Sequence, residues 1–191
     1  QGFNELSPHQ LFVKNFLSFN TPYNSLLLYH GLGTGKTCSA IGVCEEMRDY
    51  MIQMGISKRI IIVASPNVQT EFRLQLFDER KLVKNGDIWN MDACVGNKFI
   101  NEIDPMHIKN LSKINLSKQI NRLINQYYLF MGYTEFSNYI SSKLLIKDTS
   151  LSPAKKKTIL KNRLIKLFQY RLIVIDEVHN IRIANDKIGK S

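Results

Sequence analysis

The stretch "NSLLLYHGLGTGKTCSAIGV", residues 24–43, combines an apolar run, a glycine-rich turn and a helical pattern. Its apolar run at 26–29 is typical of a short buried strand, and residues 36–54 after the glycine-rich turn have the apolar spacing of a helix. Backbone N–H groups of such a turn converge at the helix N-terminus, where the helix dipole also favours anions. The stretch therefore predicts a strand, loop and helix that bind phosphate.

The loop supplies the candidate nucleotide-binding residues. Lys36 would reach the β- and γ-phosphates, and the Thr37 hydroxyl would ligate Mg²⁺. The pattern G-x-x-x-x-G-K-[ST] is incomplete, because His30 occupies the position of its first glycine. The other residues expected to contact the nucleotide here are Gly31, Leu32, Gly33, Thr34 and Gly35.

A second motif, "LIVIDEVH", spans residues 172–179. Asp176 directly follows four apolar strand residues, where a carboxylate can hold Mg²⁺, and Glu177 can polarise the attacking water. An acid pair at a strand end can also simply face solvent. Combined with the loop that ends at Lys36, the pair predicts a nucleotide-binding enzyme that uses Mg²⁺ for phosphoryl transfer.

The rest of the chain alternates short apolar runs with helical patterns, which predicts one α/β domain over 1–191 with a mostly parallel sheet. "RIIIVA" at 59–64 is expected to be a strand buried on both faces. A helix should begin after Ser65-Pro66-Asn67, another at Ser117, and a third after Ser152. Further expectations are a helix opening at Ser7, strands at 93–95, 128–131 and 172–175, and an exposed loop at 137–152.

Positive charge is concentrated in one part of the chain. Residues 1–97 carry 9 Lys/Arg and 9 Asp/Glu, residues 98–171 carry 14 and 4, and residues 172–191 carry 3 and 3. The net charge of +10 therefore comes from 98–171. Such a block attracts phosphate backbones by releasing counterions, although a solvated lysine-rich surface has the same composition.

The three cysteines, Cys38, Cys44 and Cys94, form no C-x-x-C pair. They favour reduced, buried side chains in a reducing intracellular compartment over disulfides or zinc. No apolar run approaches the length of a membrane span and no signal pattern opens the chain, so no membrane association is expected. A first residue other than Met suggests a piece of a longer protein.

The D-E-x-H box at 176–179 makes the chain resemble the first RecA-like domain of superfamily 2 helicases and translocases, which are P-loop NTPases. In that family the first loop position varies, which accommodates His30. "LSPHQ" at 6–10 resembles the upstream glutamine motif, which makes Gln10 a candidate to recognise adenine. The resemblance implies that His179 couples the nucleotide site to the nucleic-acid site.

Two further strings carry the resemblance. "IIVASPNVQTEF" at 61–72 resembles motif Ia, whose turn, here Pro66 and Asn67, touches the nucleic-acid backbone in the family. "FMGYTEF" at 130–136 resembles motif Ib, with Gly132 and Thr134 at the turn. Gly132 departs from relatives that often have Thr or Ser there, and the basic stretch at 98–171 is less family-like.

"YHGLGTGKT" and "VIDEVHNIR" together are similar to ATPases of large nucleocytoplasmic DNA viruses, of the type of the poxvirus early transcription factor small subunit. The resemblance implies an ATP hydrolase that uses ATP and Mg²⁺, with a second RecA-like domain in the same protein and DNA or RNA as partner. RNA polymerase or other transcription proteins are further expected partners. For a viral protein it implies the virion and host cytoplasm. Without the second domain, 191 residues should bind nucleotide weakly and hydrolyse it slowly.

Two alternatives stay open. A different P-loop enzyme, such as a nucleotide kinase or GTPase, would lack the D-E-x-H box, and a GTPase would need an N-K-x-D motif that we do not find. A transcription-complex subunit could instead use the nucleotide as a conformational switch and bind partner proteins without unwinding.

Overall fold

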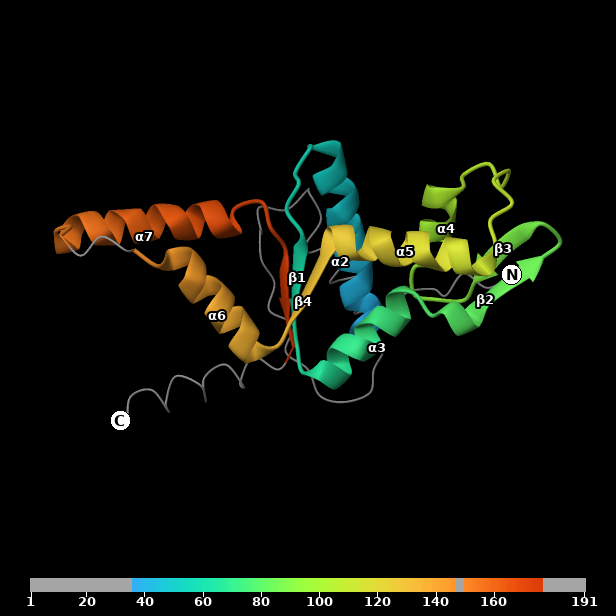
Figure 1. The fold of residues 1–191 in the computed structure, drawn as a ribbon, viewed down its shortest axis with the longest axis horizontal. Helices are drawn as coiled ribbons and strands as arrows, with labels where there is room; N and C mark the ends of the chain where they lie inside the picture. Colours follow the sequence, from blue (N-terminus) through green and yellow to red (C-terminus); the bar gives the residue numbers. More distant parts are fainter. Residues whose placement is uncertain (1–35, 147–149, 177–191) are drawn as a thin grey trace.

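The computed structural model describes residues 36–146 and 150–176. Its central sheet has three parallel strands, β1 (Ile60–Val63), β4 (Tyr128–Met131) and β5 (Ile173–Ile175), in the order β4-β1-β5. β1 lies in the middle, where Ile62 is in register with Phe130 on one side and Val174 on the other. The predicted α/β class is confirmed as a small parallel sheet flanked by helices (Figure 1).

The two faces of β1 belong to two hydrophobic clusters, because side chains alternate along a strand. Ile60 and Ile62 pack in the larger cluster with residues of α2 (Lys36–Gln53), α3 (Pro66–Leu76) and α5 (Lys113–Tyr127). Ile61 and Val63 pack in the smaller cluster with residues of α6 (Tyr133–Leu144). All four β1 residues are buried, as the uninterrupted apolar run predicts.

A small lobe lies on one side of the sheet. It contains the 3₁₀ helix η1 (Glu79–Lys81), the antiparallel strands β2 (Leu82–Asn85) and β3 (Ile88–Met91), and α4 (Lys98–Ile103). Gly86, with φ +62°, allows the two-residue turn between β2 and β3. Helix α5 leads from this lobe back to β4 (Figure 1).

On the opposite side, α6 and α7 (Pro153–Phe168) form an arm that projects away from the sheet (Figure 1). Ser152 caps α7 by accepting a hydrogen bond from the Lys155 N–H, and Pro153 occupies the first turn. No residue of α7 is buried. The predicted start of α7 is confirmed, but its apolar residues are only partly covered.

Several local expectations are wrong. Residues 93–95 form a turn, and the strand pair lies at β2 and β3 instead. Helix α5 begins after the Ser112 cap, so Ser117 lies inside it as a buried residue. Residues 137–144 belong to α6 rather than to an exposed loop. The helix expected after Ser7 and the strand at 26–29 lie outside the described residues.

The expectation of three reduced cysteines is wrong for two of them. Cys38 in α2 and Cys94 after β3 are joined in a disulfide, with 5.2 Å between their Cα atoms. A separation of 56 residues hides this proximity in the sequence. Cys44 is free and buried, as expected, and burial raises the pKa of its thiol. Within the described ranges, no helix is long and apolar enough to cross a membrane.

Candidate functional site

The carboxyl edge of the sheet gathers the segments that the motifs single out. Val63, Met131 and Ile175 are in register at the ends of β1, β4 and β5. The ladder continues one step further, because the Asp176 N–H donates to the Val63 carbonyl at 2.9 Å. Asp176 therefore stands, half-buried, at the edge where the chain leaves β1 and β4.

The turn after β1 leads directly into α3. Ser65 has an extended backbone, Pro66 begins the helix, and the Asn67 side chain is exposed. The Gln69 side-chain amide donates to the Ala64 carbonyl at 2.8 Å, which holds the helix start against the strand end. Pro66 and Asn67 thus lie at the same edge of the sheet as Asp176.

The turn after β4 has the same form. Gly132 is the N-cap of α6, and its N–H donates to the Glu135 carboxylate at 3.4 Å. Its φ of −75° suits any residue, and a Cβ there would meet nothing within 4 Å. Thr134 follows in the first turn of α6. Gly132 is therefore not required by the local backbone.

Sequence reasoning missed a contact that joins this turn to the acidic motif. The Tyr133 hydroxyl donates to the Asp176 carbonyl at 2.8 Å. The two residues are 43 positions apart, so no local pattern could reveal the pair, although Tyr133 lies inside the "FMGYTEF" string. The bond ties the backbone of Asp176 to the start of α6.

Helix α2 brings the end of the glycine-rich loop to the same edge. Lys36 and Thr37 are its first two residues, and its N-terminal end lies toward the carboxyl ends of the strands (Figure 1). The first turn of α2 contains no acidic residue, so its dipole is left to favour an anion. The edge therefore combines a helix N-terminus, a carboxylate and two strand-to-helix turns.

Four of the predicted sites cannot be placed. Gln10, the loop from Gly31 to Gly35, Glu177 and His179 lie outside the described residues. Their roles stay predictions.

A buried charged cluster anchors the other end of α2 to the lobe. Arg48, whose side chain is 1% exposed, pairs with Glu45 and Glu102, each at 2.8 Å. Its guanidinium also lies over the rings of Phe99 and Tyr127. Burial opposes the positive charge, but hydrogen bonds to Glu102 and Glu45 outweigh it and raise the pKa of Arg48. This cluster connects α2 with α4 and lies away from the carboxyl edge.

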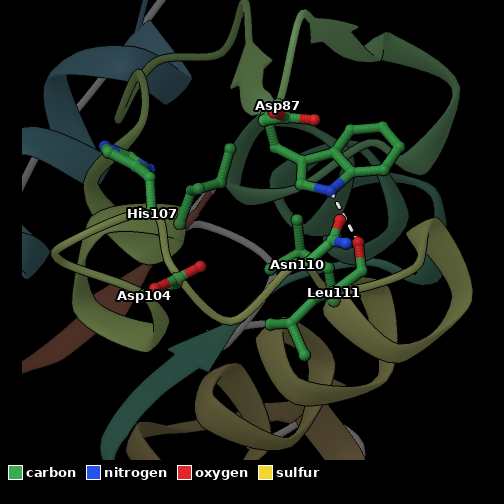
Figure 2. A pocket seen from close by; sticks show the side chains of 8 residues that line it. Asp87, Asp104, His107, Asn110 and Leu111 are labelled. Atoms are coloured by element: carbon green, nitrogen blue, oxygen red, sulfur yellow. Dashed lines mark hydrogen bonds between the residues drawn. The ribbon is translucent and has the colours of Figure 1, made fainter.

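The lobe also contains a small hollow between β3, α4 and the 104–111 segment (Figure 2). Polar groups that line it already form hydrogen bonds within the protein. The Asp104 carboxylate accepts the N–H groups of Ile108 and Lys109, each at 3.1 Å. The Trp89 indole N–H donates to the Leu111 carbonyl at 2.8 Å. The hollow is therefore part of the structural support for a tight loop.

Comparison with known proteins points to viral helicase-like proteins. One Acanthamoeba polyphaga mimivirus protein provisionally named an ATP-dependent RNA helicase is 26% identical over 191 residues, covering 93% of this chain and 15% of that protein. A second mimivirus protein with the same kind of name is 27% identical over 173 residues, covering 90% and 24%. An African swine fever virus protein named early transcription factor large subunit homologue is 26% identical over 141 residues, covering 70% and 13%.

The chain is therefore distantly homologous, over most of its length, to giant-virus proteins provisionally named helicases and to early transcription factor large subunit homologues. It spans less than a quarter of the length of these relatives. No protein-family model matches it, and neither does any solved structure.

Proposed function

We propose that the chain is the ATP-binding, first RecA-like domain of a nucleic-acid-dependent ATPase of helicase superfamily 2, within a viral transcription or genome-processing machine. The observation that carries this proposal is the shared carboxyl edge. Asp176 and both strand-to-helix turns lie at this edge, and the start of α2 lies toward it (Figure 1). Ligands of open parallel α/β sheets bind at the carboxyl ends of the strands.

The chemistry follows from the residue types. The Lys36 ammonium and the N-terminal N–H groups of α2 hold the phosphates of ATP, while Glu177 orients the attacking water. The Thr37 hydroxyl and the Asp176 carboxylate are oxygen donors, which fit Mg²⁺. When bound, Mg²⁺ neutralises charge on the β- and γ-phosphates.

The same edge accounts for nucleic-acid coupling. Pro66, Asn67, Gly132 and Thr134 contact the nucleic-acid backbone, and His179 links that contact to the nucleotide, while Gln10 selects adenine. The Tyr133 hydrogen bond to the Asp176 carbonyl supplies a physical link between one turn and the acidic motif. A second RecA-like domain in the whole protein completes the site, so the 191-residue chain alone binds ATP weakly and turns it over slowly.

Nucleotide binding tests this proposal. A fluorescent ATP analogue is titrated into the chain with Mg²⁺, alongside Lys36→Ala and the control Lys118→Ala. Lys118 is an exposed α5 residue. We expect Lys36→Ala to abolish measurable binding and Lys118→Ala to leave it unchanged. Equal binding by all three proteins would overturn the proposal.

A second function is favoured by the similarity to early transcription factor large subunit homologues, which covers 70% of the chain. A transcription-complex subunit could use ATP as a switch and bind RNA polymerase or other transcription proteins. ATPase activity of the full-length protein with and without DNA or RNA separates the two. Stimulation by nucleic acid supports the motor, and its absence supports the switch.

A further inference from the structure

The positive charge of residues 98–171 is divided between the two sides of the molecule. Residues 98–127, in and around the lobe, carry 5 Lys/Arg and 2 Asp/Glu, whereas residues 150–171 carry 7 Lys/Arg and no acid. Part of the positive charge of residues 98–127 is neutralised by ion pairs within the protein. Lys98 pairs with Glu45 at 3.0 Å and with Asp49 at 2.7 Å. Most of the excess charge therefore lies on the α7 side.

The lysines of α7 are presented to solvent. Lys155, Lys157, Lys161 and Lys166 are exposed, and no carboxylate of the described residues forms an ion pair with them. The helix has 16 residues, so it extends for about 24 Å. Its own sequence contains no Asp or Glu. Every charged side chain of α7 is therefore positive.

The C-terminal half of α7 is fixed to the rest of the protein by two sets of hydrogen bonds. The Arg163 guanidinium donates to the carbonyls of Leu144 and Leu145 at the end of α6. The Lys58 ammonium donates to the carbonyls of Lys166 and Gln169 at 2.6 and 2.8 Å. Partial burial and the nearby charges of Arg171 and Lys166 lower the pKa of Lys58. The lysine side chains are thus held on a positioned helix.

An exposed aromatic side chain, Tyr170, lies just after the C-terminal end of α7. Tyr170 is 71% exposed and has φ +55°, which is an uncommon conformation for a bulky residue. It follows Lys166 by one helical turn and adjoins the Lys58 contact at Gln169. An exposed aromatic ring beside lysines is the arrangement on which unpaired bases stack.

We propose that α7 and Tyr170 form a binding surface for single-stranded nucleic acid, with phosphates along Lys157 and Lys161, which lie four residues apart on one side of the helix, and a base on Tyr170. This inference rests on the proposed function, which makes nucleic acid the partner. Tyr170 precedes β5 and lies at the amino edge of the sheet, opposite Asp176. The surface is therefore a second contact, separate from the turns at 65–67 and 132–134.

Fluorescence anisotropy of labelled oligothymidylate with the 191-residue chain tests the surface. The test pair is Lys157→Gln with Lys161→Gln, and the matched control is Lys118→Gln with Arg122→Gln on α5. Both pairs are exposed, four residues apart and equal in charge change. We expect the test pair to weaken binding about tenfold and to reduce the salt slope by about 1.4, the value for two lost phosphate contacts on a single strand. The control pair should change affinity less than about twofold.

Substitutions of Tyr170 distinguish base stacking from charge attraction as contributions to single-strand binding. Tyr170→Ala should weaken single-strand binding by roughly 5- to 150-fold and leave duplex binding unchanged, whereas Tyr170→Phe should keep both. Equal effects of the two charge pairs would overturn the inference. So would equal binding of polyglutamate, which would indicate an acidic protein partner. Nucleotide binding is measured on every variant. If the α7 and Tyr170 substitutions leave oligothymidylate binding unchanged while ATP binding is intact, only this surface is refuted. If the chain binds oligothymidylate but not ATP, the proposed function is refuted.

Discussion

Arg48→Ala should destabilise the protein strongly, because it removes the centre of the buried cluster that joins α2 to α4. Arg48 donates to both Glu45 carboxylate oxygens and both Glu102 oxygens, at 2.8–3.1 Å. Its guanidinium lies 5.2 and 5.0 Å from the ring centroids of Phe99 and Tyr127. The substitution leaves Glu45, which is 5% exposed, without its main cation.

Removing one partner of a buried ion pair costs roughly 3–5 kcal/mol. Lys98 and the Tyr128 hydroxyl still contact Glu45, so part of its charge remains compensated. We therefore expect a loss of about 3–4 kcal/mol, a large share of the roughly 5–15 kcal/mol that stabilises a typical domain. The melting temperature should fall by roughly 6–16 °C.

Urea unfolding followed by circular dichroism measures this loss, with Lys118→Ala as the surface control. Glu45→Gln with Arg48→Met removes both charges and should be less destabilised than Arg48→Ala, because no uncompensated charge stays buried. A free energy of unfolding for Arg48→Ala within about 1 kcal/mol of the parent would refute the reasoning.

Three further perturbations address other contacts. Cys94→Ser should lower stability by about 4 kcal/mol, because the disulfide closes a segment of 56 residues, and equal masses before and after reduction would contradict the bond. Tyr133→Phe should cost about 1 kcal/mol and lower MgATP affinity by loosening Asp176, whereas Gly132→Ala, which meets no neighbour, should change neither. Arg80 lowers the pKa of Asp78 below its usual value. Stability from this pair is therefore present above about pH 4 and lost as pH falls further, and Asp78→Asn should flatten that acid-range slope in unfolding free energy.

The elements with strong local signals were predictable from the sequence. "RIIIVA" has four consecutive apolar residues that become β1, and both of its faces are buried. Proline at the first helical position marked the start of α7, whereas α3 begins at Pro66 itself rather than after Asn67 as expected. Asp176 comes directly after an apolar run, so its position beyond β5 followed from the pattern.

Other elements depend on competing or tertiary signals. Gly86-Asp87 is a possible two-residue hairpin turn, but the polar residues around it obscured β2 and β3. Ser112 and Ser117 are both possible caps, and burial of Leu116 and Ile120 places the second serine inside α5. Helix α6 is mostly polar, and it is held by burial of Phe136 and by Arg163 at its end.

Contacts between distant residues were beyond the reach of local patterns. The disulfide, the Arg48 pair with Glu102 and the Tyr133 bond to Asp176 join residues 56, 54 and 43 positions apart. Each becomes close only after the sheet has brought its helices together. The charge excess of residues 150–171 can be counted from the sequence, but only the structure shows that Lys155, Lys157, Lys161 and Lys166 are exposed.

In the proposed site, the start of α2 and Asp176 hold one nucleotide at the carboxyl edge of the sheet. A double-mutant cycle on MgATP affinity tests it most directly, with Thr37→Ala, Asp176→Asn and the combined variant. Two ligands of one Mg²⁺ should be non-additive by about 1 kcal/mol or more. Strict additivity, or MgATP binding that neither substitution changes, would contradict the account.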